Sequence, residues 1–197
     1  MPEPAVEAAV RRSTPADAVV KHFSELTSEE LYGILQLRSE VFVVEQECLF
    51  LDLDGIDMYP DTLHAFIPHA GAPTPFRDSH GEQTGLSVKP AAYARLLPHG
   101  LIDGPAGHPD GRSIGRVVSD SAVRSTGAGR AVVGRLVEEF DGTLLTLNAQ
   151  SYLEDFYGAF GFVRSGEDFM EDGILHIPMR RSAGGAVGAG SGIERSE

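Results

Sequence analysis

The sequence predicts an α/β protein whose single domain has a central twisted mixed sheet flanked by helices. The first observation is a strand, helix, strand unit, in which helical spacing over 130–140 lies between β-type runs at 114–118 and 143–147. The second is the full order of expected elements, β-α-β-β-β-α-β-α-β-β, which is typical of a mixed sheet with helices on its faces. The third is size, because 197 residues with 42% hydrophobic content suffice for one domain with a full-sized core.

The first part of the chain is expected to begin without structure and then to form a strand and a helix. Residues 1–16 are rich in Ala, Pro and Glu without a stable period, which predicts a disordered extension before a domain that spans 17–181. Residues 18–23 alternate as a strand does. Thr27 and Glu30 have the spacing of a capping box, which marks the start of an amphipathic helix.

Two long loops separate the strands that follow. An acidic, turn-like stretch at 52–57 precedes a short strand at 63–68, and the partner strand is expected at 91–97. Residues 69–90 form a loop with Pro, Gly and His, and a second Gly/Pro loop covers 99–111. Loops of this length inside a compact domain are usually functional or mobile.

The last part of the chain completes the sheet. A short helix is expected at 152–160, a strand opens at Phe162, and a strand at 174–179 closes the ordered region. Residues 182–197 consist mainly of Gly, Ala and Ser and cannot bury a core, so we expect a disordered tail.

Composition narrows the functional class. The single cysteine, Cys48, excludes an internal disulfide, supplies too few thiolates for a structural zinc site and favours a reducing compartment. Neither a signal peptide nor a run of about 18 apolar residues is visible, so we expect a cytoplasmic protein that does not span a membrane. The formal net charge of −13 disfavours nucleic acid as a partner; this acidity either keeps the protein in solution or attracts cationic substrates.

Residues 124–130 are the strongest candidate for a binding segment. They follow a predicted strand, contain Gly127 and Gly129 and open a predicted helix. Free backbone N–H groups at the positive end of a helix dipole hold phosphates, and glycines let phosphate oxygens approach the amides. Arg124 or Arg130 can add charge-assisted hydrogen bonds. The segment therefore predicts a phosphorylated cofactor; the alternative is a glycine-bearing helix entry that only packs tightly.

This segment resembles the acetyl-CoA-binding motif of the GNAT acyltransferases. A second GNAT-like motif follows at 150–162 and ends in Tyr157-x-x-x-Gly161-Phe162, so the two motifs stand in the order that the family has. Several further pieces are similar to the ElaA family within this group, namely 35–38, 41–46, 93–95, 115–117 and 172–177. The resemblance runs from about residue 20 to residue 179, apart from the two long loops.

The resemblance implies the GNAT fold and transfer of an acetyl group from acetyl-CoA to an amine that attacks the thioester directly. The backbone around Val117 and Val118 is then expected to bind the pantetheine arm and polarise the thioester carbonyl. Gln150 stands where many of these enzymes have an asparagine that contacts pantetheine. Tyr157 is expected to protonate the leaving thiolate, whereas the residue alone is more typical of a half-buried helix aromatic. The pyrophosphate is assigned to Arg124, Ser125, Thr126, Gly127, Ala128, Gly129 and Arg130.

Acyl-homoserine lactone synthases, which have a GNAT-like fold, share an Arg-x-x-x-Phe, an acidic stretch and an Arg-Leu-Leu-Pro strand end with this chain. We rank lactone synthesis below amine acetylation because no tryptophan follows Phe42 and the Gly-rich loop is present. Acceptor-site residues suggested by the two resemblances are Arg38, Phe42, Asp52, Asp54, Asp57, Arg95 and Arg116. The carboxylates of Asp52, Asp54 and Asp57 could bind a cationic amine. The alternative is a solvated acidic turn whose aspartates bind their own backbone.

The general base is expected to be Glu45 at the helix end or, as second choice, His176 on the last strand. A carboxylate or a neutral imidazole, relayed through water, can deprotonate an ammonium. Their ordinary alternatives are a surface charge and a partly buried histidine. The other histidines show no ligand spacing, so we expect no metal. The expected partners are acetyl-CoA and a small-molecule or peptide amine, a homodimer is compatible with the sequence, and a non-catalytic acyl-CoA-binding module is the remaining alternative.

Overall fold

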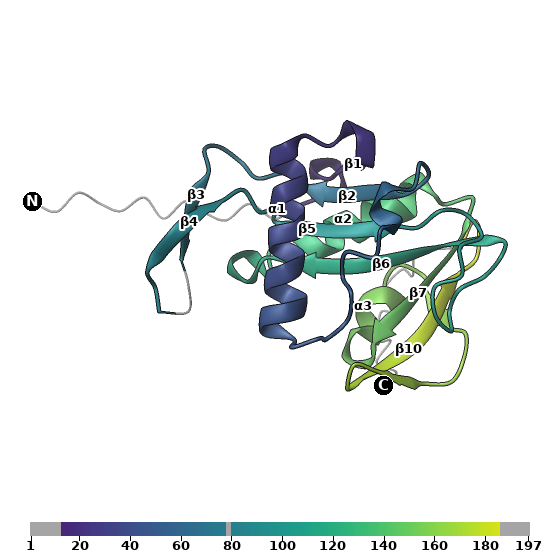
Figure 1. Cartoon of the computed structure of the whole chain (residues 1–197). Helices are drawn as coiled ribbons and strands as arrows, with labels where there is room; N and C mark the ends of the chain where they lie inside the picture. The colour runs from purple at the N-terminus through teal and green to yellow at the C-terminus, as the bar shows by residue number, and fades with distance from the viewer. Residues whose placement is uncertain (1–12, 78–79, 186–197) are drawn as a thin grey trace, which may run out of the picture.

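The computed structural model describes residues 13–77 and 80–185, which form a large mixed sheet with helices on both faces and a separate two-stranded hairpin (Figure 1). The predicted α/β class and its central mixed sheet are confirmed. The strands are β1 (Val19–His22), β2 (Leu63–Ile67), β3 (Thr74–Arg77), β4 (Gln83–Ser87), β5 (Ala92–Leu96), β6 (Gly111–Ser119), β7 (Leu144–Gln150), β8 (Val163–Arg164), β9 (Phe169–Glu171) and β10 (Ile174–Arg181). The α-helices are α1 (Ser28–Arg38), α2 (Ala128–Glu139) and α3 (Glu154–Gly158).

The order of the main sheet is β1-β2-β5-β6-β7-β10-β8, with β9 on the other part of β10. Neighbouring strands are antiparallel except β6 and β7, which are parallel and are joined by α2. The parallel ladder runs from Gly111 opposite Leu144 to Ser113 opposite Thr146. Beyond this point the two central strands part, which creates an opening in the middle of the sheet.

Two cores cover the two faces of the sheet, because alternate residues of a strand point to opposite sides. On one face, Ile34 and Leu37 of α1 pack with Phe66 and Tyr93. On the other, Ala65 and Ala94 join the larger core, whose helical side chains come mainly from α2, among them Val132, Val133, Leu136 and Val137. Figure 1 shows α1 crossing in front of the strands and α2 behind them.

The start of α1 forms as its sequence predicts, and the helical segment continues beyond the last residue of α1. Thr27 Oγ1 accepts the N–H of Glu30 at 3.1 Å, and the Glu30 carboxylate accepts the N–H of Thr27 at 2.9 Å, which completes a capping box. After Arg38 the chain continues in a π-helical turn, Ser39–Glu45. Such turns are often found at functional sites.

The loop expected at 69–90 is not entirely irregular. It contains the two-stranded hairpin β3–β4, which projects from the body of the domain (Figure 1). Most side chains of this hairpin are exposed, so no apolar alternation marks it in the sequence.

Both ends of the described chain correct the expected domain boundaries. Residues 13–16 are not a disordered extension: a 3-10 turn at Pro15–Asp17 packs against α2, where Gly134 leaves space for Pro15. Residues 182–185 also differ from the expected tail, because the N–H of Gly184 donates to the carbonyl of Asp141 at 2.7 Å. The rest of the two predicted disordered ends, 1–12 and 186–197, lies outside the described residues.

Candidate functional site

A cavity of about 330 Å³ lies where β6 and β7 part. One wall comes from Ile114 to Val117 of β6, and another comes from Leu147, Asn148 and Gln150 of β7. The turn after α1 and the segment that follows add Phe42, Gln46, Cys48 and Phe50, and β9 and β10 close the far side. Segments that are distant in sequence therefore meet at the split in the sheet.

A bulge in β6 shapes this wall of the cavity. Tyr93 of β5 lies opposite Val118 and Arg95 lies opposite Gly115, so two residues of β6, Arg116 and Val117, face a single residue of β5. Arg116 has a φ of 51°, which is uncommon for a residue with a side chain. A bulge takes its extra residue out of the ladder and redirects the backbone. Val117 borders the cavity, whereas the side chain of Val118 is buried against α1.

The segment 124–130 forms the entry to α2. Gly127 is the N-cap, with a φ of 91°, and no side chain caps the helix. Intrahelical bonding begins with the N–H of Ala131, which donates to Gly127. The N–H groups of Ala128, Gly129 and Arg130 therefore have no intrahelical acceptor and stand at the positive end of the dipole. This arrangement suits an anion.

The same segment also packs tightly, which is the property that the alternative interpretation, a glycine-bearing helix entry, predicted for it. A Cβ on Gly129 would lie 2.9 Å from Ser119 Oγ, so glycine lets the helix approach the end of β6. The Arg130 guanidinium lies over the rings of Phe156 and Phe160, 5.5 and 5.1 Å from their centroids. Arg124 forms an ion pair with Glu45. Phosphate binding and tight packing are thus compatible in this segment.

Tyr157 of α3 borders the cavity and is only 5% exposed. Its ring packs edge-on against Phe156 and Phe162. Among the described residues its hydroxyl has no hydrogen-bond partner. Burial, with a smaller contribution from Tyr152, raises the pKa of Tyr157 well above its usual value, so the phenol is protonated at neutral pH. The residue is more buried than a half-buried helix aromatic and faces the cavity.

The two candidate bases differ in position. Glu45 does not border the cavity, and its carboxylate is engaged by Arg124. His176 of β10 does border it, opposite Gln150 in the ladder. The Nδ1 of His176 lies 2.9 Å from the carbonyl of Ile174, which can only accept, so Nδ1 carries the hydrogen. In the neutral ring Nε2 then has a free lone pair, and the geometry favours His176.

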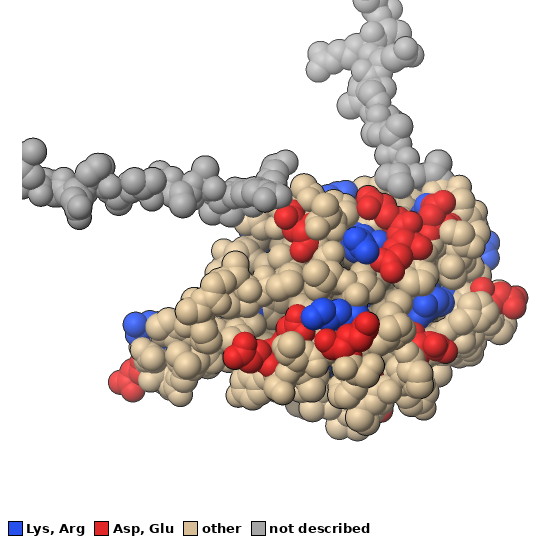
Figure 2. Space-filling model, turned by 90° about the horizontal axis from the view of Figure 1, so that it is seen from above, with Lys and Arg blue, Asp and Glu red and all other residues tan. Residues whose placement is uncertain are grey.

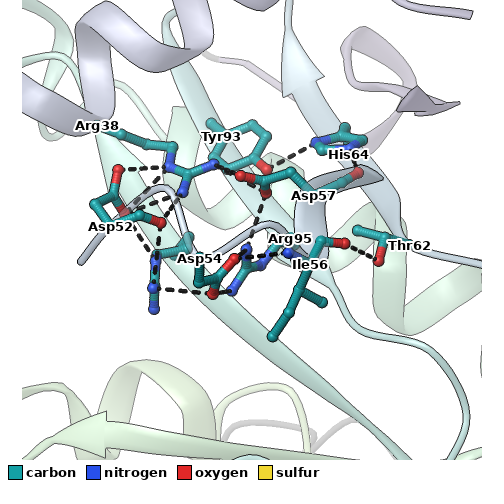
Figure 3. Close-up of polar contacts among 10 residues, drawn as sticks. Arg38, Asp52, Asp54, Ile56, Asp57, Thr62, His64, Tyr93 and Arg95 are labelled. Carbon is teal, nitrogen blue, oxygen red and sulfur yellow. Dashed lines mark hydrogen bonds and ion pairs between the residues drawn. The ribbon is translucent and has the colours of Figure 1, made fainter. Parts of the chain in front are cut away.

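The acidic stretch after α1 is part of a buried ion-pair network (Figure 3). Three arginines from three elements meet three aspartates of this stretch. Arg38 binds Asp52 at 3.0 Å and Asp57 at 2.9 Å. Arg95 of β5 binds Asp54 at 2.7 Å and Asp57 at 2.9 Å. Arg116 donates to the side chains of Asp52 at 2.8 Å and Asp54 at 3.3 Å.

The network divides the residues expected at the acceptor site into two groups. Of the seven residues assigned to it, Phe42, Asp54 and Arg116 border the cavity. The other four, Arg38, Asp52, Asp57 and Arg95, are not among the residues that line the cavity, and they pair with one another (Figure 3). The alternative interpretation predicted aspartates that bind the backbone of their own turn. Among the three aspartates, Asp54 makes such a bond, because its Oδ1 accepts the N–H of Ile56 at 3.0 Å.

Burial of the network affects two nearby groups. Burial opposes ionisation of Asp54, but hydrogen bonds from Arg95 and the charges of Arg95 and Arg116 hold the pKa of this carboxyl below its usual value. His64 lies between the Tyr93 hydroxyl, at 2.8 Å from Nδ1, and the Asp57 carbonyl, at 3.1 Å from Nε2. Burial lowers the pKa of His64, so the ring is neutral, and its contact with the Asp57 carbonyl links it to the network.

Several cavity residues were not predicted from the sequence. Asn148 anchors the loop between β5 and β6: its Nδ2 donates to the carbonyl of Asp103 at 3.0 Å, and its Oδ1 accepts the N–H of Ala106 at 3.1 Å. The polar residue that follows the apolar run 143–147 was the available signal for it. Gln46 accepts from Gln150 at 3.3 Å, and Asp103, Glu171 and Asp172 place carboxylates at the cavity.

On the face that Figure 2 shows, coloured basic side chains lie beside acidic ones, and no broad basic patch appears among the residues drawn in colour. In the described ranges, no helix has the length and apolar character that crossing a membrane requires. Nor does that part of the chain contain a cluster of three or more His, Cys, Asp or Glu arranged to hold a metal ion.

Comparison with known proteins links this geometry to one family. Residues 94–183 match the family model described as an acetyltransferase (GNAT) domain. Protein ElaA of Escherichia coli is 35% identical over 164 residues, covering 81% of this chain and 92% of ElaA. A UPF0039 protein of Synechocystis is 34% identical over 164 residues, covering 81% and 90%.

Solved structures show the same likeness. An acyl-CoA N-acyltransferase from Pseudomonas aeruginosa has a TM-score of 0.65 and 38% identity, with 84% of this chain and 98% of that chain covered. The Escherichia coli ElaA structure gives 0.64 and 32%, with the same coverage. A CoA-dependent acyl-homoserine lactone synthase is similar with a TM-score of 0.61, over 84% of this chain and 82% of that chain, but at 14% identity the likeness concerns the fold alone.

Proposed function

The chain belongs to the GNAT acetyltransferase family, in the group that includes ElaA and the UPF0039 proteins, and from this premise we propose that it transfers the acetyl group of acetyl-CoA to a primary amine in a ternary complex. The observation that carries the proposal is the cavity at the split between β6 and β7, whose wall includes the Tyr157 hydroxyl, a group without a hydrogen-bond partner among the described residues. The open entry of α2 supplies the second half of the donor site.

On the donor side, the free N–H groups of Ala128, Gly129 and Arg130 would hold the pyrophosphate, with Arg124 turning from Glu45 toward it. Their place at the helix start gives an anion a stabilisation of about 0.3–1 kcal/mol from the dipole. The pantetheine arm would then enter between the parted strands, beside the bulge at Val117 and the amide of Gln150. Backbone N–H groups at the bulge would polarise the thioester carbonyl.

In the transfer step, the amine nitrogen attacks the thioester carbon and forms the C–N bond. The carbonyl oxygen takes up negative charge and returns it as the C–S bond breaks. His176 Nε2, through a water molecule, accepts the proton that the amine loses, and the Tyr157 hydroxyl gives its proton to the departing thiolate. The high pKa of the buried phenol keeps it protonated until the thiolate forms beside it, and the same burial raises the proton affinity of sulfur.

The test is CoA release from acetyl-CoA across a panel of primary amines, with mass spectrometry of the acylated product. Tyr157→Phe keeps the ring and should lower kcat by about 100-fold or more, because it removes the general acid. Tyr32→Phe is the matched control, since this tyrosine is 65% exposed on α1. A Tyr157→Phe rate within a few-fold of wild type would contradict the assignment.

A thermal shift with acetyl-CoA separates the enzyme from a binding module. Binding to the folded state raises the midpoint of unfolding in both cases. Stabilisation together with acetylation of at least one amine supports the proposal, whereas stabilisation without turnover of any amine favours the non-catalytic module. The absence of any stabilisation would contradict both.

A further inference from the structure

Three carboxylates at the cavity remain outside the ion-pair network. They belong to Asp103, Glu171 and Asp172, and among the described residues none of them forms an ion pair. The cationic side chain that borders the cavity, Arg116, is already shared between Asp52 and Asp54. The network contains three arginines and three aspartates, so the unpaired carboxylates leave the cavity with a net negative charge.

These carboxylates reach the cavity from two different segments. Asp103 belongs to the loop between β5 and β6, which Asn148 fixes from both sides through Asp103 and Ala106. Its Oδ2 lies over Gly115, 3.8 Å from the position a Cβ would take there. Glu171 is the last residue of β9 and pairs with Ile174 of β10, and Asp172 begins the turn between these strands with a φ of 48°. Each group is therefore held by backbone that is itself anchored.

Two observations accompany this list of acids: the first reports the negative field that the acids create, and the second, which is independent of them, indicates that the cavity receives a ligand. The Cys48 thiol lies close enough to sense the field: burial first, and then the charges of Asp172 and Glu171, raise its pKa. The hydroxyl of Tyr157, a residue 95% buried, borders the same space without a hydrogen-bond partner among the described residues. The lining of the cavity thus contains both a proton donor, the Tyr157 hydroxyl, and unpaired carboxylates.

We propose that the acceptor is a small aliphatic diamine, whose one amine reacts while the second, as an ammonium, is held by Asp103, Glu171 and Asp172. This inference rests on the proposed function. The reacting nitrogen must lose its proton to attack, whereas the distal nitrogen keeps its charge and changes no bond. A carboxylate or a methyl group in the distal position loses this attraction, so charge at that end determines specificity.

The first experiment measures binding and not turnover. Cadaverine, hexylamine and 5-aminopentanoate present a distal ammonium, methyl and carboxylate on chains of similar length. Calorimetric titration of each into the protein saturated with CoA should give affinities in that order, with cadaverine about tenfold tighter than hexylamine at low salt. The difference should shrink as salt is added, because Glu171 and Asp172 are exposed to solvent.

The second experiment removes the charges. In the triple variant Asp103→Asn, Glu171→Gln, Asp172→Asn, the ratio of cadaverine to hexylamine affinity should fall to near one. Asparagine tolerates the left-handed backbone of position 172. The control is the double variant Asp110→Asn, Glu167→Gln, which neutralises acids away from the cavity, one of them in the same loop as Asp103, and should keep the preference.

The outcomes distinguish this inference from the proposed function. Preferential cadaverine binding that the triple variant abolishes supports the diamine site, even if no amine is acetylated; that result would overturn only acetyl transfer. Acetylation of other amines with no preference for cadaverine would overturn the diamine site and leave acetyl transfer intact. Equal binding of cadaverine and hexylamine to the wild-type protein, at any salt concentration, also overturns it.

Discussion

Two groups of acidic side chains lie within one region of this protein and have opposite electrostatic surroundings. Asp52, Asp54 and Asp57 are bound by three arginines and are largely withdrawn from solvent. Glu171 and Asp172 on the opposite side of the cavity are exposed and have no basic partner in the described ranges. The first group ties the segment after α1 to β5 and β6, and the second group leaves its charge available to a ligand. Acids that lie in one region of the fold therefore differ in whether their charge is used within the protein.

The largest expected effect separates the two groups by stability. Arg38→Met should destabilise the protein by about 3–5 kcal/mol, because it leaves Asp52 and Asp57 short of a buried partner. Arg135→Met is the matched control, since Arg135 forms an exposed pair with Glu139 on α2 and should cost only about 0.5 kcal/mol. Urea unfolding, monitored by circular dichroism, measures both.

Neutralising the unpaired acids at the cavity should leave the stability of the protein almost unchanged. The triple variant at Asp103, Glu171 and Asp172 should change the free energy of unfolding by no more than about 0.5 kcal/mol, because no folded-state ion pair is lost. A loss as large as that of Arg38→Met would show that these carboxylates are structural, and the contrast between the two groups would not hold.

Sequence patterns predicted the fold because its signals are local. The capping box at Thr27 and Glu30 and the helix from 130 to 140 depend on neighbours a few residues apart. The partners of Asp57 do not: Arg38 is 19 residues before it and Arg95 is 38 residues after it. A charge pattern along the chain cannot show which charges are cancelled across the sheet. The sequence pattern therefore placed Asp52 and Asp57 at the acceptor site, although arginines bind both carboxylates, and it gave no sign of the unpaired Asp103, Glu171 and Asp172 at the cavity.

Lowering the pH should destabilise the protein by less than Arg38→Met does, and it should act through the network that contains Asp52, Asp54 and Asp57. His64 has a pKa that burial lowers, so the unfolded chain binds more protons than the folded one once pH falls below about 6.5. Its contribution is complete above that pH and is lost progressively as pH falls from there through the lowered pKa of the folded state, with a slope of at most about 1.4 kcal/mol per pH unit. The pKa of Asp54 is also lowered, and its contribution is lost only below about pH 4.

Unfolding curves at several pH values in this range measure the slope. His64→Gln should flatten it, since the variant has no imidazole to protonate between the Tyr93 hydroxyl and the Asp57 carbonyl. His108→Gln, which removes an exposed imidazole, is the control. An unchanged slope in His64→Gln would mean that other groups govern the acid response.

The smallest effect concerns the unpaired group and uses Cys48, the single cysteine of the chain, as a probe. Burial raises the pKa of the Cys48 thiol, and Asp172 and Glu171 raise it further, so the thiolate fraction at a fixed pH is low. Glu171→Gln with Asp172→Asn should lower the pKa toward its usual value and speed alkylation by iodoacetamide about threefold. Asp103→Asn is the control, because Asp103 does not contribute to this shift. If Asp103→Asn accelerated the reaction and the double variant did not, the negative field at the cavity would come from the loop between β5 and β6 and not from the turn into β10.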